Sequence, residues 1–363
     1  MGQAKTGFIG IGTMGWPMAA NLVKGGCEVL VYDSNRAQVD KFCLEHPTAR
    51  AASSLADIAA QDFVVTMLPT GQIVHEVLVR AEQGAFFNAV KRGTIVIDMS
   101  SSEPTGTQAL ARLFAQKGVA FIDAPVSGAR PRAITGTLTI MIGGDDKAAI
   151  EKAKPVLAKM GERLFDTGGS GTGHAVKALN NFLGATAFAA TSEAVLIAQR
   201  FGLDTRTLID IVNVSTGRSF ISEIVMKEHV LDEKYGTGFA LGLLAKDVKI
   251  AADLGEAVKL DAPLSRLVRE RWAGARDAVG YNADNTEAIK SWNEDLSGQK
   301  RSQAWPNLSQ TRCKRAPARP SNGATRSTKP STNSRSSSCS IFRKSSAPWR
   351  CSSWAGSWQP RWR

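Results

Sequence analysis

Gly171-Thr-Gly-His-Ala-Val-Lys-Ala-Leu-Asn-Asn-Phe182 opens the stretch that decides how this chain folds. From Thr172 to about Arg200 the chain has no proline and is rich in alanine and leucine, which predicts one long helix that ends near Phe201-Gly202. At ~1.5 Å per residue, this helix would be on the order of 40 Å long. Its middle, residues 182–198, is apolar or small on every side, so we expect it to be buried all round between two bodies of protein.

Two polar residues lie near the start of this helix. Lys177 and Asn181 are four residues apart and therefore share one face. Placing them at the start of a buried helix is costly unless a polar partner meets them there. Taken alone, Lys177 is more simply explained as a solvated lysine on a half-exposed first turn, so its interpretation depends on the rest of the chain.

The chain before this helix alternates short apolar segments with helical ones. Strands are expected at residues 7–11, 28–33, 63–68, 94–98, 119–123 and 138–142. Strands that alternate with helices of about 10–15 residues indicate βαβ units in a doubly wound parallel sheet. We therefore predict an α/β domain over residues 1–168.

After Gly171 the pattern changes, and no further strand is expected. Helices are expected at residues 204–214, 221–231, 241–258, 264–279 and 285–296. These helices predict an all-α domain over residues 169–298, which the long interdomain helix joins to the first domain.

Residues 299–363 have a different composition. They contain 14 Lys or Arg, no Asp or Glu, and five of the eight tryptophans. Removing these 14 from the 45 basic residues leaves 31 against 33 acidic residues in 1–298, so the formal charge of +12 becomes −2 for the body. The segment has too little patterned apolar surface to order itself. It is either a basic tail that touches nucleic acid or an out-of-frame translation. The missing acids and the abrupt change after Leu296 favour the second, so we expect the tail to add nothing to the fold.

The composition of the body points away from several classes of protein. Its only cysteines are Cys27 and Cys43, which offer neither a disulfide framework nor the spacing of metal ligands and suit a reducing compartment. We see no segment that approaches the length of a membrane span, and the near-neutral charge gives no reason to propose nucleic-acid binding. A soluble cytoplasmic protein without a membrane, nucleic-acid or metal partner is expected.

Gly10-Ile-Gly-Thr-Met-Gly15 follows a predicted strand and opens a predicted helix. In the dinucleotide fold the first glycine makes a tight turn, the second lets the backbone approach the pyrophosphate, and the third allows close packing of helix on strand. Asp33 ends the next strand, where a carboxylate would accept hydrogen bonds from the adenosine ribose. Because its charge would repel a 2′-phosphate, Asp33 favours NAD over NADP. Arg36 could soften this preference, although it is more simply a solvated residue on the first turn of its helix.

From Phe8 to about Leu296 the chain resembles the β-hydroxyacid dehydrogenase family, which includes 3-hydroxyisobutyrate dehydrogenases and tartronate semialdehyde reductases. The resemblance rests on motifs in the family's order: Phe8-Ile-Gly-Ile-Gly-Thr-Met-Gly-Trp-Pro-Met-Ala-Ala-Asn-Leu22, Met67-Leu-Pro69, Asp98-Met-Ser-Ser-Ser-Glu-Pro104, Asp123-Ala-Pro-Val-Ser-Gly-Ala-Arg-Pro-Arg-Ala-Ile-Thr-Gly-Thr-Leu138, Gly171–Asn181, and Phe239 with Lys246-Asp247. It implies a Rossmann-type domain followed by a helical substrate and dimerisation domain, and a homodimer or homotetramer.

The resemblance implies a role for each matching residue. Lys177 would be the general acid/base for hydride transfer between nicotinamide and the hydroxyl of a small 3-hydroxy acid. Ser127 and the Gly128 amide would hold the substrate carboxylate, Asn181 would orient the substrate, and Lys246 would support the carboxylate or the nicotinamide. The cofactor, NAD or NADP, would be held by Gly10, Gly12, Thr13, Met14, Gly15, Asp33, Met67, Leu68, Pro69, Ser101, Phe239 and Lys246.

Two positions depart from the family pattern. Ala129 stands where the family usually has a second glycine, which puts the shape of the substrate loop in question. Ser101 stands where threonine is usual, a minor change.

Other interpretations of these residues remain open. Ser127-Gly128 could be only a turn, Lys246-Asp247 an ordinary pair on a helix surface, and His174 a packing residue rather than a second base. Within the family, tartronate semialdehyde reductase and L-threonate dehydrogenase activities are alternatives. An imine reductase typically lacks the catalytic lysine, and a phosphogluconate dehydrogenase would need a longer helical domain. From another class, a non-catalytic NAD-binding sensor would not need to keep Lys177.

Overall fold

The computed structural model describes residues 4–293 and begins with a nine-stranded sheet. The predicted tail lies outside the described residues. Along the sheet the strands follow the order β3-β2-β1-β4-β5-β6-β8-β7, and β9 pairs with β8. The strands are β1 (Lys5–Ile9), β2 (Glu28–Tyr32), β3 (Arg50–Ala51), β4 (Phe63–Thr66), β5 (Ile95–Asp98), β6 (Ala120–Asp123), β7 (Val126–Ser127), β8 (Leu138–Gly143) and β9 (Gly161–Gly168). The order of the first six is that of dinucleotide-binding sheets, so the predicted Rossmann-type architecture is confirmed.

The sheet is not parallel throughout. The pairs from β3 to β6 are parallel, whereas β8 runs antiparallel to both β6 and β7. The chain reverses because a turn at Gly128 and the short helix α7 (Ala129–Thr135) join β7 directly to β8, without a full crossover. The sequence analysis also missed β3, β7 and β9, since the first two are only two residues long and β9 exposes most of its side chains.

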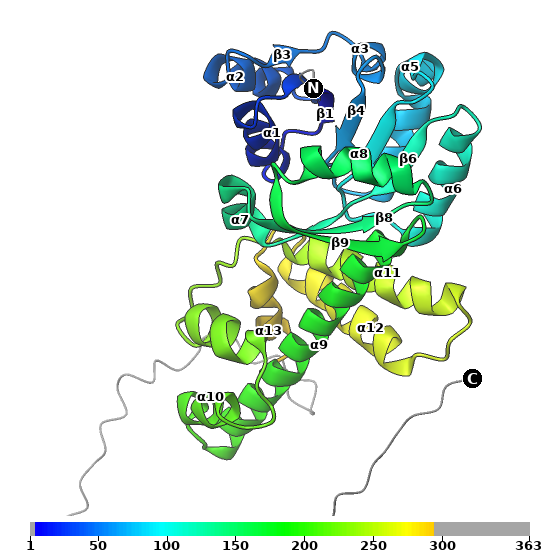
Figure 1. The fold of residues 1–363 in the computed structure, drawn as a ribbon. Coiled ribbons are helices and arrows are strands. Elements are labelled where there is room, and N and C mark those ends of the chain that lie inside the picture. Colours follow the sequence, from blue (N-terminus) through cyan, green and yellow to red (C-terminus); the bar gives the residue numbers. More distant parts are fainter. Residues whose placement is uncertain (1–3, 294–363) are drawn as a thin grey trace, which may run out of the picture. The chain divides into compact units, whose positions relative to one another are not determined.

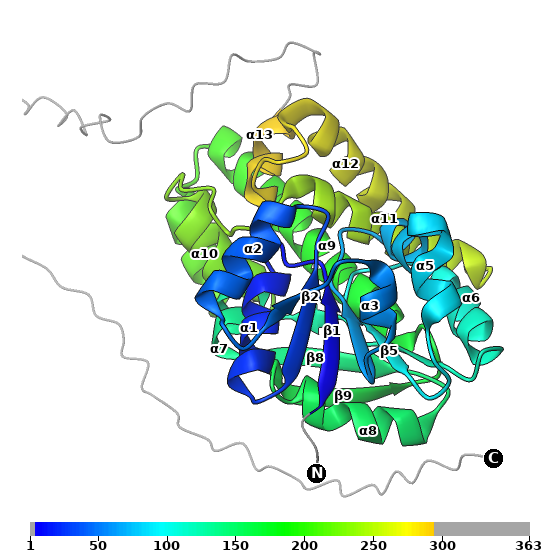
Figure 2. The ribbon, with the colours of Figure 1, turned by 90° about the horizontal axis from the view of Figure 1, so that it is seen from above.

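Helices cover both faces of this sheet (Figures 1 and 2). They are α1 (Gly15–Lys24), α2 (Arg36–Glu45), α3 (Leu55–Ala59), α4 (Gly71–His75), the π-helix η1 (Glu76–Arg80), α5 (Ala81–Ala89), α6 (Pro104–Ala115), α7 and α8 (Lys147–Leu157). Neighbouring strand residues point to opposite faces and enter separate cores. Phe8 packs in the cluster that contains α1 and α2, whereas Ile9 packs in the cluster that contains α3, α5 and α6. This arrangement fixes the strand ends from which the site loops emerge.

The second half of the described chain is helical, and the predicted long helix is confirmed as α9 (Thr172–Phe201), which ends at Gly202 with φ 87°. It is followed by α10 (Thr205–Asn213), the π-helix η2 (Ile221–Val230), α11 (Leu241–Ala257), α12 (Pro263–Val279), the 3₁₀ turn η3 (Asn285–Glu287) and α13 (Ala288–Ser291). The helix expected at 285–296 is two short pieces within residues 285–293, and residues 294–296 lie outside the described part of the chain. Phe188 of α9 packs on Trp272 of α12 with ring centroids 5.6 Å apart.

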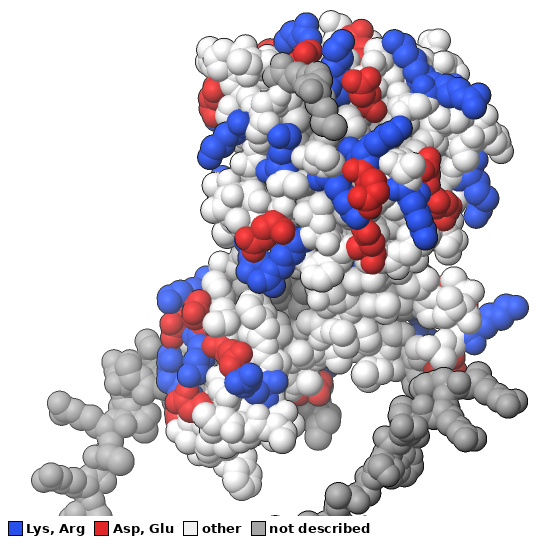
Figure 3. Space-filling view, viewed as in Figure 1, with Lys and Arg blue, Asp and Glu red and all other residues white. Residues whose placement is uncertain are grey.

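The expectation that α9 is buried all round is wrong for the single chain. Phe188 and Val195 are buried, but Leu183, Ile197 and Phe201 are 65%, 67% and 88% exposed. These residues lie on one side of the helix and form an apolar stripe. Figure 3 shows charged side chains intermixed over the α/β half and a broad uncharged area over the helices next to it.

The expectation that no segment approaches the length of a membrane span is also wrong. By length and composition α9 could cross a membrane, with a mean hydropathy of 1.3 over its most apolar window. Length and composition alone are weak grounds, since helices that pack inside proteins pass the same test. Here α9 packs along α11 and α12 and against β8.

Candidate active site

The glycine loop between β1 and α1 has the geometry that a pyrophosphate site needs. Gly10 has φ 94°, a conformation that favours glycine. A side chain on Gly15 would place its Cβ 1.8 Å from the Gly10 carbonyl oxygen, so helix and strand touch here. A Cβ on Gly12 would meet nothing within 4 Å. The loop therefore leaves open space directly at the N-terminus of α1, where Thr13 is exposed and Met14 half-buried.

Asp33 closes this loop from the end of β2. Its carboxylate accepts hydrogen bonds from the Ile11 amide at 2.9 Å and from the Asn35 amide at 2.8 Å. The side chain is thus fixed beside the glycine loop. Arg36 is not simply solvated, since it donates to the Asp40 carboxylate at 3.0 Å and to the Ala52 carbonyl at 3.1 Å.

Lys246 connects the helical half to two loops of the α/β half. From α11, its Nζ donates to the carbonyl oxygens of Ser101 at 2.6 Å and of Pro69 at 3.2 Å. The Pro69 loop follows β4 and the Ser101 loop follows β5, and the Leu68 amide donates to Ser100 Oγ at 2.9 Å. Since both loops leave the carboxyl ends of parallel strands, Lys246 reaches the edge at which such sheets bind ligands.

A buried network of hydrogen bonds holds the loop around Ser101 in place. Asp98 accepts hydrogen bonds from Thr66 Oγ1 at 2.9 Å and from Ser102 Oγ at 2.7 Å. His174 lies 2.7 Å from Thr107 Oγ1 through Nδ1 and 3.1 Å from the Ser100 carbonyl through Nε2. Both ring nitrogens therefore have protein partners, and His174 has the packing role that the sequence analysis preferred over that of a second base.

Asp123 fixes where α9 begins. It lies at the end of β6 and accepts hydrogen bonds from the Gly171 amide at 2.8 Å and the His174 amide at 3.0 Å. A carboxylate at a helix N-terminus satisfies otherwise unpaired amides and interacts favourably with the helix dipole. Lys177 follows His174 by about one helical turn. The hydrogen bonds to Asp123 that start α9 therefore also fix the position of Lys177 along the helix axis.

Asn181 contacts Asp247 of α11, and the charge of Asp247 also acts on Lys177. The side-chain Nδ2 of Asn181 donates to Asp247 Oδ2 at 2.6 Å, and Lys246 Nζ lies 3.0 Å from Asp247 Oδ1. This ion pair lacks hydrogen-bond geometry, and Oδ1 has no hydrogen-bond partner among residues 4–293. Because Asp247 is only 2% exposed, the site keeps one unused buried acceptor.

The charges around Lys177 act on its protonation. Burial lowers the pKa of the Lys177 ammonium, the Asp247 carboxylate opposes that shift, and the Lys246 ammonium adds to it. A lowered pKa makes the neutral amine, the form that accepts a proton, available nearer to neutral pH. His174, on the same helix, is occupied by its own hydrogen bonds.

Asp247→Asn tests this charge arrangement. The amide keeps the shape of the side chain but removes the charge that raises the pKa of Lys177, so that pKa should fall. In the direction of alcohol oxidation, kcat/KM should then begin its rise at lower pH than in the wild type. The pH profile of kcat/KM measures this shift. A profile that keeps its position while kcat/KM drops at every pH would show that Asp247 acts only as a structural residue.

The loop that follows β7 has unusual backbone geometry. Ser127 pairs with Thr139 of β8, Gly128 has φ 128°, and Ala129 has φ 52°. An alanine in this left-handed region costs roughly 1 kcal/mol. Ala129, at the position of the family's second glycine, is therefore a strained residue in the predicted substrate loop.

Phe239 lies just before α11. It is partly buried, its carbonyl accepts hydrogen bonds from the Asn285 amide and Nδ2, and the next residue, Ala240, bridges to Asp284. These contacts fix the start of α11, which carries Lys246 and Asp247.

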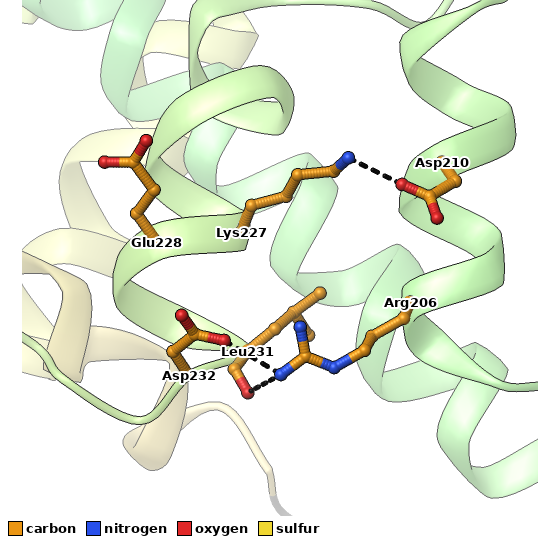
Figure 4. A pocket seen from close by; sticks show the side chains of 6 residues that line it. All are labelled: Arg206, Asp210, Lys227, Glu228, Leu231 and Asp232. Carbon is orange, nitrogen blue, oxygen red and sulfur yellow. Dashed lines mark hydrogen bonds and ion pairs between the residues drawn. The ribbon is translucent and has the colours of Figure 1, made fainter.

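One pocket lies between the two halves and another within the helical half. The first, of about 280 Å³, has Thr70, Lys246, Arg269 and Tyr281 in its lining and borders the Lys246 contacts. The other, of about 270 Å³, lies between α10 and η2 (Figure 4). There Lys227 pairs with Asp210 at 2.6 Å and Arg206 with Asp232 at 2.8 Å, so the charges neutralise one another.

The structure gathers most of the predicted residues into two groups, whereas Ser127 and Gly128 lie at the end of β7 and Phe239 lies before α11. The glycine loop, Asp33 and the loops at 67–69 and 101 lie at the carboxyl ends of β1, β2, β4 and β5. Lys177 and Asn181 lie with Asp247 in the helical half, and Lys246 contacts both groups. The roles of these residues remain predictions. Asp98 and Asp123 were not recognised as site residues; each ends a strand, which was the available signal, and Asp247 was seen only as a member of the Lys246-Asp247 pair.

The chain is similar to known dehydrogenases over most of its length. Residues 5–169 match the NAD-binding domain of 6-phosphogluconate dehydrogenase, and residues 171–292 match the NAD-binding domain of NADP-dependent 3-hydroxyisobutyrate dehydrogenase. The chain is 36% identical to 2-(hydroxymethyl)glutarate dehydrogenase of Eubacterium barkeri, over 81% of this chain and 96% of that protein. It is also 36% identical to the NAD-dependent L-serine dehydrogenase of Pseudomonas aeruginosa, over 72% of this chain and 88% of that one.

Solved structures agree with these relatives. The 3-hydroxyisobutyrate dehydrogenase of Mycobacterium tuberculosis with L-serine superposes with a TM-score of 0.72 at 28% identity, over 80% of this chain and 99% of that one. An imine reductase of Streptomyces aurantiacus superposes with a TM-score of 0.51 at 19% identity and shares the fold alone.

Proposed function

This chain belongs to the β-hydroxyacid dehydrogenase family, and we propose that it oxidises a small 3-hydroxy acid of the 3-hydroxyisobutyrate type with Lys177 as the general base. As a member of that family it is an NAD(P)-dependent oxidoreductase that acts on a CH–OH group. The observation that carries the proposal is the group formed by Lys177, Asn181 and Asp247, which Lys246 ties to the loops of the dinucleotide domain.

The cofactor fits the residues that are present. The open space at Gly12 suits a pyrophosphate, and the fixed Asp33 carboxylate suits a ribose. When bound, the nicotinamide supplies the acceptor for the hydride. Lys177 in its neutral form takes the proton of the substrate hydroxyl, Asn181 orients that hydroxyl, and Ser127 with the Gly128 amide holds the carboxylate. In the reverse direction Lys177 returns the proton. We assign residues 1–168 to cofactor binding and 169–298 to the helical domain.

The substrates named for three relatives share one structural feature, which narrows the class of substrate proposed for this chain. 3-Hydroxyisobutyrate, L-serine and 2-(hydroxymethyl)glutarate each carry a hydroxymethyl group on the carbon next to a carboxylate. They differ only in the second substituent of that carbon. Ser127, Gly128 and Lys177 address the shared part, which supports a substrate of this form.

The test is the formation of NADH or NADPH by the purified chain with 3-hydroxyisobutyrate, L-serine, D-glycerate, L-threonate and 2-(hydroxymethyl)glutarate. Oxidation of a hydroxymethyl acid is expected. Preference for D-glycerate or L-threonate would favour the tartronate semialdehyde reductase or L-threonate dehydrogenase alternative. Binding of NAD without turnover of any acid would instead identify a cofactor-binding sensor.

Asp33 should make NAD the preferred cofactor. Its carboxylate is held in place by the Ile11 and Asn35 amides and would face the negative charge of a 2′-phosphate, while Arg36 is engaged elsewhere. We expect a higher kcat/KM with NAD than with NADP, and Asp33→Ala should narrow the gap mainly through the KM for the cofactor. An equal or higher kcat/KM with NADP in the wild type would refute this assignment.

We also propose that two copies associate in the cytoplasm through the apolar stripe of α9. Leu183, Ile197 and Phe201 expose large apolar side chains along one side of this helix, a surface that a second copy would cover. Ile197→Glu should therefore yield monomers in light scattering, while Leu44→Glu, at an even more exposed leucine of α2, should not. A monomeric wild type, or a dimer that tolerates Ile197→Glu, would contradict this interface.

A further inference from the structure

Two arginines of the substrate loop have no assigned role. Between Asp123 and Asp145 the chain contains Arg130 and Arg132 but no acidic residue. Both are exposed, and within the described part of the chain neither guanidinium has a hydrogen bond or an ion pair. The hydrogen bonds that Thr135 and Thr137 donate to Arg132 go to its carbonyl oxygen. The loop therefore carries two uncompensated positive charges.

Arg132 is placed directly on the predicted carboxylate site. Its amide donates to the Gly128 carbonyl at 3.4 Å. A Cβ on Gly128 would lie 2.5 Å from Arg132 Cδ and 2.8 Å from its Cβ, so the arginine stem covers this glycine. Gly128 thus has to be glycine both for its φ of 128° and because Arg132 occupies the adjacent space. The stem leads from the Ser127-Gly128 end of the site toward solvent.

The charged groups differ in how deeply they are buried, and this difference separates their roles. Asp247 is buried and Lys177 and Lys246 are at most partly accessible, so these groups surround the inner end of the site. Arg132 is exposed, and its stem lies on Gly128. On the proposed function, the part that all candidate acids share, carboxylate and hydroxymethyl, is addressed by the inner groups together with Ser127 and Gly128. The remaining substituent of the same carbon is then the part available to Arg132.

We propose that Arg132 is a specificity-determining residue that binds a second anionic group on this substituent, so that the substrate class is a dianionic 2-(hydroxymethyl) acid. This rests on the proposed function and deepens it. A guanidinium binds a carboxylate through two parallel N–H···O bonds, a geometry that a neutral substituent cannot offer. Arg130, two residues earlier, is not among the atoms nearest to a Cβ on Gly128, and we assign it no part in this recognition.

Two acids with the same carbon skeleton test the proposal: 2-(hydroxymethyl)glutarate and 2-(hydroxymethyl)pentanoate, in which a methyl group replaces the distal carboxylate. The wild type should favour the diacid in kcat/KM by about tenfold or more, the range of a charge-assisted pair. Arg132→Met keeps a stem over Gly128 but removes the charge. It should lower kcat/KM for the diacid alone and bring the ratio close to one.

Two further variants exclude a merely structural effect. Arg132→Lys should retain part of the preference for the diacid, and Arg130→Met should leave the ratio unchanged. Equal losses with both acids in Arg132→Met would show that Arg132 binds the shared carboxylate, which overturns the proposal. A wild type that turns over the monoacid as well as the diacid overturns it while leaving the proposed function intact. Turnover of neither acid would overturn this inference, whereas the proposed function fails only if none of the five acids named above is oxidised.

Discussion

Lys177→Met should lower kcat for hydroxy-acid oxidation by on the order of 10² or more, because general acid–base catalysis typically contributes ~10²–10⁴-fold. Lys177 stands one turn beyond the helix start that Asp123 fixes, and it faces Asp247 and Lys246 across α9 and α11. Methionine fills similar space but cannot accept a proton. The rise of kcat/KM with pH, which follows deprotonation of Lys177, should disappear in the variant.

The affinity for NAD provides the control for this variant. Lys177 is not assigned to the adenosine half of the cofactor, so the Kd for NAD and the Tm should change little. If Lys177→Met keeps a near-normal kcat while a Ser127, Asn181 or His174 variant loses it, the proton passes through another group. In that case the role taken from the family resemblance would be wrong at its centre.

Gly15→Ala should destabilise the α/β domain by about 4 kcal/mol or more, in the range reserved for severe steric or packing defects. The added Cβ would lie 1.8 Å from the Gly10 carbonyl oxygen and 3.2 Å from Phe8 Cε1, so strand and helix would have to move apart. Because Phe8 lies in the core beneath α1, this movement would disturb the whole face of the sheet. A fall in Tm of roughly 10 °C is expected, to be measured by calorimetry.

Gly12→Ala is the matched control, since its Cβ would meet no protein atom within 4 Å. The fold should be retained and the Tm little changed. The methyl group would instead enter the space assigned to the pyrophosphate, so the Kd for NAD should rise. A Gly12→Ala protein that binds NAD normally would show that the cofactor does not approach the backbone at this glycine.

The elements with a strong local signal could be predicted from the sequence. The glycine loop, the buried strands β1, β4 and β5 and the proline-free α9 each carry a pattern that local physics determines. β9 could not be predicted, since most of its side chains are exposed and the strand exists only because β8 offers its edge. The same holds for the exposed side of α9, which composition alone marks as a buried helix.

The candidate site likewise contains residues that the sequence predicts and residues that it does not. Lys177, Asn181, Ser127 and Lys246 were named from motifs that are contiguous in the chain. Their supports could not be named, because Asp247 meets Asn181 from a position 66 residues away and Asp123 meets His174 from 51 residues away. A role for Arg132 also could not be inferred from the sequence, because it depends on the position of the Arg132 side-chain stem on Gly128. Contacts between distant segments depend on the packing of the two halves, which a local pattern does not encode.

The most direct measurement of the central claim follows the hydrogen itself. The purified chain is incubated with NAD and a hydroxymethyl acid, 3-hydroxyisobutyrate or 2-(hydroxymethyl)glutarate, deuterated at the hydroxymethyl carbon, and the reduced cofactor is analysed by mass spectrometry. We predict that the cofactor gains one deuterium, and that Lys177→Met forms this product at least about 10²-fold more slowly. Reduced cofactor without deuterium, or bound NAD that is never reduced by either acid, would contradict the account.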